Sequence, residues 1–366
     1  SSNLTLTEPD LEKKLFEKVE DRLQFNLNFQ QRLFPIVPDE VMRNYYSLKI
    51  SLEGKREKLA WKKQEVTVDF IANYLQLMRL KEKLEIYREN LKIAEDNLEK
   101  VKAQKKIDEV GSQQLLTAQI NLEQTKISCI KAENDFNTQK KNWYNQIGLP
   151  TDTKKIMEED TKLIADISTW MDSIKVTIDD RVLIKKELFA KYPDLKTSRL
   201  QEKLIERKIS WSQAEDWPNI NATGNYNYQK ETWNLDVGLQ LSYNIFDGHK
   251  DKLNTTEYQN KLESLKEDRH LIKSNLELDI DTLLNKLRTD RLNLKEKRIS
   301  LKKAELEEDL FYQQYEEGLI NVHQFQQKKI TRKEAEVNLN SAKNDLFITK
   351  LRLLHRLGYE ILASKS

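Results

Sequence analysis

The chain repeats itself at a constant offset of 210 residues, and this duplication constrains its fold more than any other feature. The two copies align over some 80 positions without an insertion or deletion. Identical residues include the pairs Asp69/Asp279, Leu84/Leu294, Arg88/Arg298, Ala94/Ala304 and Gly148/Gly358. A duplicated module of this length packs against its neighbours because it cannot bury its apolar face alone. We therefore expect two tandem copies of one structural unit that assemble with further copies of the chain.

Each repeat contains a long helical pattern followed by a shorter one. Prolines are absent from residues 39–149 and 219–366. Leucines recur every seven residues at Leu77, Leu84, Leu91 and Leu98, which is the spacing of a coiled-coil seam. We predict long helices over 39–107 and 249–317, tight turns near Gly111 and Gly318, and returning helices over 110–147 and 320–357. A further helical stretch is expected over 179–215.

A second pattern, strict alternation of apolar and polar residues, predicts long strands. It runs over residues 233–245 and continues in 219–229, and the repeat offset places a related strand at 23–33. Thirteen residues extend about 44 Å, and soluble strands rarely exceed ten residues. Such a hairpin is typical of a membrane β-barrel; an amphipathic hairpin covering a soluble helical bundle is the alternative. The expected lipid-facing residues are Phe25, Leu27, Phe29, Tyr226, Tyr228, Trp233, Leu235, Val237, Leu239, Leu241 and Tyr243.

Composition excludes several classes of function. Lys+Arg 62 against Asp+Glu 60 gives a net charge of +2 with mixed signs, which argues against a nucleic-acid partner. The four histidines lack metal-ligand spacing, and the eight scattered glycines form no phosphate-binding loop. We therefore expect no catalytic residues, no metal and no cofactor, and the chain is not expected to be an enzyme. The lone Cys129 is expected to be a packed side chain.

Short motifs in a fixed order give the chain a family resemblance. They are Tyr192-Pro193-Asp194-Leu195, Trp217-Pro218-Asn219-Ile220, Asn244-Ile245-Phe246-Asp247-Gly248, Tyr315-Glu316-Glu317-Gly318-Leu319 and Leu354-His355-Arg356-Leu357-Gly358. With the duplication, they resemble the TolC-type outer-membrane efflux proteins over residues 23–360. The resemblance implies a mainly helical fold with a small β part, in which long antiparallel coiled-coil hairpins continue from strands of a trimeric outer-membrane β-barrel.

The resemblance and the repeat together divide the chain into segments. We expect an N-terminal segment (1–22), a barrel strand (23–36), a first tunnel hairpin (37–149), an equatorial segment (150–178), a helix leading to the barrel (179–217), a barrel hairpin (218–247), a second tunnel hairpin (248–358) and a C-terminal tail (359–366). Two repeats imply four strands, but only three are evident. Residues 1–22 are too short to supply both the helix and the long strand that the repeat requires, so we infer that the chain is either trimmed or a divergent member with an incomplete barrel.

The resemblance also implies a function and its partners. The chain is expected to be a homotrimeric, passive exit duct of a tripartite efflux pump or a type I secretion system. It would lie in outer-membrane lipid, with its tunnel in the periplasm, and would serve an inner-membrane transporter through a periplasmic membrane-fusion adaptor. The alternative is a soluble coiled-coil scaffold of the cell envelope, and a requirement for detergent would discriminate the two.

Site residues follow from the same resemblance. Adaptor contact is expected at the hairpin tips, through Gly318 and Leu319 in the second repeat and Asp108 and Val110 in the first. The family's pore aperture is closed by rings of aspartate, but the matching positions here are Gln324, Gln327, Gln114 and Thr117. A ring of carboxylates concentrates cations, whereas amides and hydroxyls carry no charge. We therefore expect an aperture that multivalent cations do not block.

Overall fold

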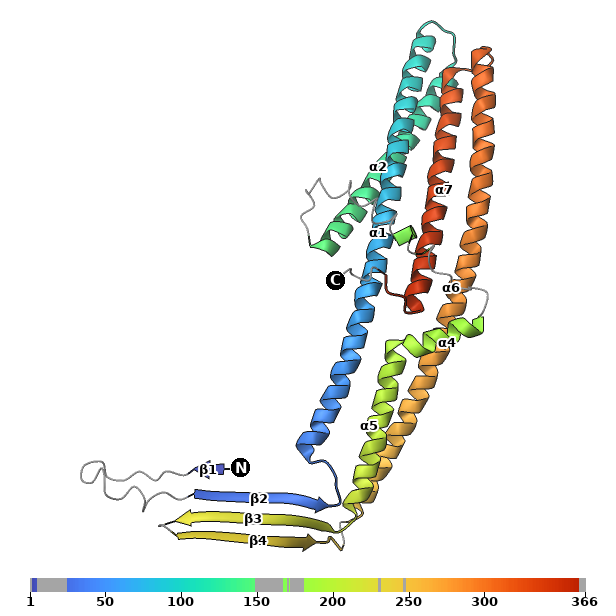
Figure 1. The fold of residues 1–366 in the computed structure, drawn as a ribbon. Helices are drawn as coiled ribbons and strands as arrows, with labels where there is room; N and C mark the ends of the chain where they lie inside the picture. The colour runs from blue at the N-terminus through green and yellow to red at the C-terminus, as the bar shows by residue number, and fades with distance from the viewer. Residues whose placement is uncertain are drawn as a thin grey trace, which may run out of the picture. The chain divides into compact units, whose positions relative to one another are not determined.

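The computed structural model describes residues 2–4, 25–148, 167–169, 171, 181–229, 232–245 and 248–361. The order of elements is β1, β2, α1, α2, α4, α5, β3, β4, α6 and α7 (Figure 1). Contacts divide the chain into two compact units. The first unit comprises Ser1–Glu57 and Pro193–Lys273, and the second comprises Lys58–Tyr192 and Ser274–Ser366.

The first unit contains one antiparallel sheet of four strands in the order β1-β2-β3-β4. The strands are β1 (Ser2–Leu4), β2 (Phe25–Phe34), β3 (Asn219–Gln229) and β4 (Thr232–Ser242). Our expectation of only three strands was wrong: β1 pairs with the first three residues of β2. Sequence alternation missed it because three residues are too few to show a period of two.

Strand β4 ends three residues earlier than the alternation predicts, so Tyr243 lies beyond it. The reason lies in the partner strand. Ser242 pairs with Asn219, the first residue of β3, and Asn219 follows Pro218. Proline has no backbone N–H and cannot extend the ladder, so residues after Ser242 have no strand to pair with.

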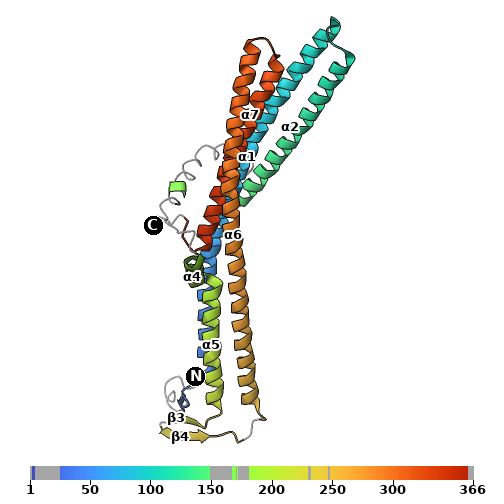
Figure 2. The same ribbon diagram turned by 90° about the vertical axis from the view of Figure 1, so that its right-hand side faces the viewer.

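The two longest helices confirm the repeat at both ends. Helices α1 (Glu40–Lys106) and α6 (Lys250–Glu316) each have 67 residues and are related by the offset of 210. Their returning partners are α2 (Ser112–Ile147) and α7 (Val322–Arg356), and each pair forms a helical hairpin (Figure 2). The Asp39 carboxylate accepts a hydrogen bond from the backbone N–H of Met42 at 2.7 Å, which starts α1.

The helical stretch predicted over 179–215 is two helices rather than one. They are α4 (Arg181–Lys191) and α5 (Pro193–Glu215), separated at Tyr192. Proline disfavours helical geometry in the residue before it and supplies no N–H to the preceding turn. Pro193 therefore ends α4 and serves as the first residue of α5.

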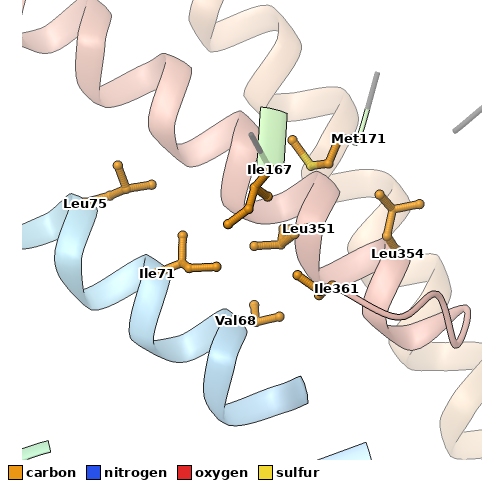
Figure 3. Packing of buried hydrophobic residues seen from close by; sticks show 8 residues of the cluster. All are labelled: Val68, Ile71, Leu75, Ile167, Met171, Leu351, Leu354 and Ile361. Carbon is orange, nitrogen blue, oxygen red and sulfur yellow. The ribbon is translucent and has the colours of Figure 1, made fainter. Parts of the chain in front are cut away.

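In the second unit, α1 packs against α7 through an apolar cluster that also takes in two residues of the segment between the hairpins. Val68, Ile71 and Leu75 of α1 face Leu351 and Leu354 of α7, together with Ile167, Met171 and Ile361 (Figure 3). The predicted seam is also confirmed against α2. Leu77 packs on Trp143 and Tyr144, and Leu84 packs on Cys129 and Ala132. Cys129 is thus a buried packing residue, as expected.

Candidate functional site

The strand register places the apolar residues of three strands on one face of the sheet. Directly paired residues point to the same face of a sheet. The resulting rows are Phe25/Tyr228/Trp233, Leu27/Tyr226/Leu235 and Phe29/Gly224/Val237, followed by Ala222/Leu239 and Ile220/Leu241. Their side chains on β4 are widely exposed, with Val237 at 78% and Leu239 at 74%. Within the described residues, the sheet therefore presents a mainly apolar face, interrupted by Gln31 beside Ala222, that no helix covers.

The opposite face of the same sheet is polar. Its rows are Asn26/Asn227/Asn234, Asn28/Asn225/Asp236, Gln30/Thr223/Gly238 and Arg32/Asn221/Gln240. Arg32 donates a hydrogen bond to the Asn219 side chain, and the Thr223 hydroxyl donates to the Gly238 carbonyl at 3.3 Å. A sheet that is apolar on one face and amide-rich on the other matches the two environments of a barrel wall, lipid and water.

Both hairpin tips adopt the same backbone turn, although their sequences differ. Asp108 has a left-handed φ of 56° and Gly318, its counterpart at the repeat offset, has 72°. In each tip, the backbone N–H of this residue donates to the carbonyl oxygen of the residue three positions earlier. The N–H of the next residue donates to the carbonyl oxygen five positions earlier, over 3.0 Å for Glu109 and 2.8 Å for Leu319. Aspartate tolerates this conformation better than most side chains, so the first tip forms without the glycine.

The two tips carry an apolar and an acidic residue at swapped positions. The first tip exposes Ile107 where the second has Glu317, and it has Glu109 where the second exposes Leu319. Leu319 is 70% exposed. Of the four predicted adaptor-contact positions, Asp108, Gly318 and Leu319 are exposed and Val110 is half-buried. All four lie in the two turns.

The second tip also carries an aromatic cluster that the first tip lacks. The Tyr315 ring stacks on Phe325 at 5.7 Å, and Tyr312 lies 5.6 Å from the same ring. The Tyr312 hydroxyl donates to Glu316 at 2.5 Å, and this bond raises the pKa of Tyr312. The sequence signal for this cluster is the spacing of Tyr312 and Tyr315 before the glycine turn.

Two of the predicted aperture residues have a structural role that sequence analysis missed. Gln324 is the third residue of α7, and its Oε1 accepts a hydrogen bond from the Asn321 N–H at 3.1 Å. Asn321 Oδ1 in turn accepts from the Gln324 N–H at 3.0 Å, so the two residues form a capping box. In the first repeat, Gln114 Oε1 accepts from the Gly111 N–H at 3.2 Å. The Asn-x-x-Gln and Gly-x-x-Gln spacings are the sequence signals for these caps.

The other two aperture positions are exposed helix residues. Gln327 lies one turn beyond Gln324 on α7, and Thr117 lies one turn beyond Gln114 on α2. The Thr117 hydroxyl donates to the Gln113 carbonyl at 2.9 Å. The four positions therefore share the first turns of the returning helices, and their side chains are uncharged.

Ion pairs join the helices near and behind the tips. Lys328 binds Glu307 at 2.8 Å across the α6/α7 hairpin. Lys333 of α7 binds Glu89 of α1 at 2.5 Å, which links the two hairpins within the second unit.

Burial raises the pKa of Glu82 on α1, and the neighbouring carboxylates of Glu85 and Glu336 raise it further.

Within the described ranges, no cluster of three His, Cys, Asp or Glu side chains could hold a metal ion. None of the helices in the described part of the chain is apolar over a length sufficient to cross a membrane.

Among the helical histidines, His355 is buried, and its Nε2 lies 3.2 Å from the Trp61 carbonyl oxygen. Burial lowers the pKa of His355, and the hydrogen bond with the Trp61 backbone partly opposes that shift.

Comparison with known sequences gives one family match. The sequence model described as "Outer membrane efflux protein" matches residues 185–359, which span α5, the β3–β4 hairpin and the whole second helical hairpin. A comparison with curated proteins gives no match.

Comparison with solved structures finds outer-membrane channels at low sequence identity. The outer membrane protein VceC of Vibrio cholerae has a TM-score of 0.66 at 13% identity, over 98% of this chain and 86% of that chain. The CmeC outer membrane channel of Campylobacter jejuni has a TM-score of 0.67 at 13% identity, over 100% and 78%. The open-state MtrE outer membrane channel of Neisseria gonorrhoeae has a TM-score of 0.65 at 14% identity, over 92% and 75%.

At these identities the likeness to solved structures establishes the fold, and the family match adds sequence evidence for the second repeat. The mainly helical fold with a small sheet, predicted from the duplication and the alternating strands, is confirmed. The predicted resemblance to the TolC-type outer-membrane efflux proteins is likewise confirmed, since residues 185–359 match the outer membrane efflux protein family and the chain has the fold of outer-membrane channels.

Proposed function

We propose that this protein is an outer-membrane channel-tunnel, the passive exit duct of a tripartite efflux pump or a type I secretion system. The observation that carries the proposal is the two-faced sheet. Its apolar face is exposed, and its strands β2 and β4 are each followed by a 67-residue helix. The family match over 185–359 and the fold of outer-membrane channels support it. The duct has no chemistry of its own, so energy comes from an inner-membrane transporter.

Three copies would close the sheet into a barrel. Among the residues that the structure describes in one copy, the outer edge of β4 has no partner strand, and β1 covers only the Phe25–Leu27 part of the β2 edge. Open edges of this kind are not tolerated in lipid, because every backbone N–H and C=O must be satisfied there. Closure between copies satisfies them, places the apolar face against outer-membrane lipid and turns the amide-rich face toward a water-filled lumen.

The hairpin tips are the proposed contact with a periplasmic membrane-fusion adaptor. Adaptor contact through Gly318 and Leu319 is supported by the exposure of Leu319 and by the adjacent cluster of Tyr315 and Phe325. Tyrosine is one of the residue types that most often dominate binding energy at interfaces, and Leu319 adds apolar area beside it. The first tip presents Asp108 and Val110 on the same backbone turn, and its neighbours are lysines rather than aromatics.

The proposed aperture is neutral. Gln324 and Gln114 each use Oε1 to cap their helix, which leaves the amide Nε2 to line the pore. Gln327 and Thr117, one turn further along, add another amide and a hydroxyl. A pore lined in this way offers hydrogen bonds to cargo without selecting for the sign of its charge.

Sizing in detergent tests the proposal. The protein should require detergent to stay dispersed, because its apolar sheet face is otherwise exposed to water, and it should elute as a trimer. A monodisperse monomer in detergent-free buffer would contradict the proposal and would favour a soluble scaffold.

A further inference from the structure

The helices of the two hairpins lie side by side within the second unit, in the order α2, α1, α7, α6 (Figures 1 and 2). Helix α1 contacts α2 through Leu84 and Cys129, and α7 contacts α6 where the Thr349 hydroxyl donates to Asp290 at 2.6 Å. Helices α1 and α7 join the two hairpins in the middle. Helices α2 and α6 therefore form the two outer edges of a row of four.

The middle contact of this row, between α1 and α7, combines an ion pair with apolar packing. Lys333 of α7 binds Glu89 of α1, and beside this pair Ile86 and Ile93 of α1 pack on Ile330 of α7. The α1 residues follow one another at intervals of three and four, so they share one face of the helix. The contact is antiparallel, because α1 runs toward the tip and α7 runs away from it.

The repeat gives this contact a counterpart at the two edges of the row. Adding the offset of 210 converts α1 into α6, and subtracting it converts α7 into α2. Glu89 then becomes Ile299, and Lys333 becomes Glu123. The face of α1 that meets α7 thus corresponds to a face of α6, and the matching face of α7 corresponds to a face of α2.

Both counterpart faces are apolar and exposed. The α6 stripe consists of Leu292, Ile299 and Leu306, and the α2 stripe consists of Leu116, Ile120, Ile127 and Ile130. Among the described residues, these seven side chains are between 50% and 63% exposed. The α6 stripe lies opposite Asp290, which faces α7, and the α2 stripe lies opposite Cys129, which faces α1. Each edge helix is therefore apolar on the side away from its own hairpin, where a surface helix is ordinarily polar.

We propose that the α6 stripe of one copy packs antiparallel against the α2 stripe of a second copy, as α1 packs against α7 within each copy. Three such contacts join three rows of four helices into a ring around the proposed lumen. The pairing rests on the proposed trimeric duct, and it adds which helices meet between copies, through which side chains and in which register.

The register follows from the ion pair in the middle of the row. Because Glu89 lies level with Lys333, the repeat sets Ile299 level with Glu123. Both helices rise by the same distance per residue, so this one pair fixes the others. The apolar residues that come level are Leu292 with Ile130 and Leu306 with Leu116. The two stripes therefore cover one another along their length.

Charged residues along the two faces are complementary in this register. Glu296 comes level with Lys126, and Lys303 lies within one helical turn of Glu123. All four side chains are exposed in the single copy, where both α6 charges pair with neighbours on α6 itself. Opposite charges beside an apolar seam set the orientation and register of helix pairs. The proposed contact therefore matches acid with base as well as apolar with apolar.

Disulfide formation between copies tests the pairing. The single native cysteine is first replaced by Cys129→Ala, and the double variant Ile299→Cys with Glu123→Cys is then oxidised in detergent. We expect linked dimers and trimers on a non-reducing gel, because α1 and α7 separate α2 from α6 within one copy. The matched control, Arg298→Cys with Glu123→Cys, moves the exposed α6 thiol by about 100° around the helix and should stay unlinked.

Charge exchange provides a second measurement on the same pairing. Lys303→Glu should lower the trimeric fraction measured by light scattering in detergent, and adding Glu123→Lys should restore it. A wild-type trimer whose double variant stays unlinked or forms the bond within one chain would overturn the α6–α2 pairing and leave the duct function standing. A charge exchange without restoration would overturn it in the same way. A wild type that is monomeric in detergent would instead refute the proposed function.

Discussion

The proposed neutral aperture would become a charged one through a single substitution, Gln324→Glu. In the structure, Gln324 Oε1 accepts the Asn321 N–H at 3.1 Å, and Asn321 Oδ1 accepts the Gln324 N–H at 3.0 Å. Glutamate serves this capping position as well as glutamine does. A carboxylate in the first turn of a helix also gains about 0.3–1 kcal/mol from the helix dipole. We therefore expect the variant to fold with unchanged or slightly greater stability.

The electrostatic effect is much larger than the effect on folding. Two unit charges 4 Å apart interact by about 1 kcal/mol in water and by about 4 kcal/mol at an effective dielectric constant of 20. Three carboxylates that each lie about 4 Å from a monovalent cation would favour it by about 3 kcal/mol in water, which is roughly a hundredfold in affinity. A trivalent cation gains more.

The assay is single-channel block in a planar bilayer by a trivalent cation such as hexamminecobalt(III). The wild-type channel should be blocked weakly, and Gln324→Glu should lower the blocking concentration by about a hundredfold or more. The control Gln119→Glu adds the same charge to an exposed position on α2, on the side away from Gln114, and should change block little. Strong block of the wild type, or an unchanged block in a trimeric Gln324→Glu channel, would refute the reasoning.

Four further predictions follow from particular residues. Gly318→Ala forces a side chain into a φ of 72° and should cost about 1–2 kcal/mol in chemical denaturation; an unchanged midpoint would contradict the turn. Trp143→Ala empties a buried site and should cost about 3–5 kcal/mol, visible as a lower melting temperature. Val237→Arg places a charge on the apolar sheet face, costs about 2–4 kcal/mol at the bilayer midplane and should reduce the protein recovered in outer-membrane fractions. Burial and two neighbouring carboxylates raise the pKa of Glu82 above its ordinary 4.5, so the folded state keeps a proton that the unfolded chain has released. The free energy of unfolding therefore falls as pH rises from 4.5 through the folded pKa. Glu82→Gln should flatten that slope in unfolding measured against pH.

The sequence was sufficient to predict the parts of the fold that repeat. The offset of 210 placed both ends of α1 and α6 within a residue of their observed positions, because the heptad seam recurs in each copy. Buried partners recur as well: Leu77 and Leu287 are both buried, as are Ala94 and Ala304. Long-range periodicity is therefore the reliable signal in this chain.

The errors lie where a local constraint overrides periodicity. Pro193 divides one predicted helix into α4 and α5, and Pro218 shortens the ladder so that Tyr243 falls outside β4. The strand Ser2–Leu4 is too short to show alternation, and only its pairing with β2 reveals it. Single residues and three-residue elements leave no period to detect.

The candidate site was predictable in position but not in detail. The tip residues Asp108 and Gly318 lie at the turns where the repeat places them. The capping bonds of Gln324 and Gln114 were not predicted, because a cap depends on the exact first residue of a helix, and α7 and α2 begin two residues later than the predicted 320 and 110. The lipid-facing and adaptor-contact residues stay predictions, since each depends on a partner outside the single chain.

Ion conduction by the purified protein tests the central claim most directly. Reconstituted into a planar lipid bilayer, the protein should give long-lived unitary conductance steps from a species that sizes as a trimer in the same detergent. A purified trimer that inserts into the bilayer and carries no current would contradict a water-filled duct.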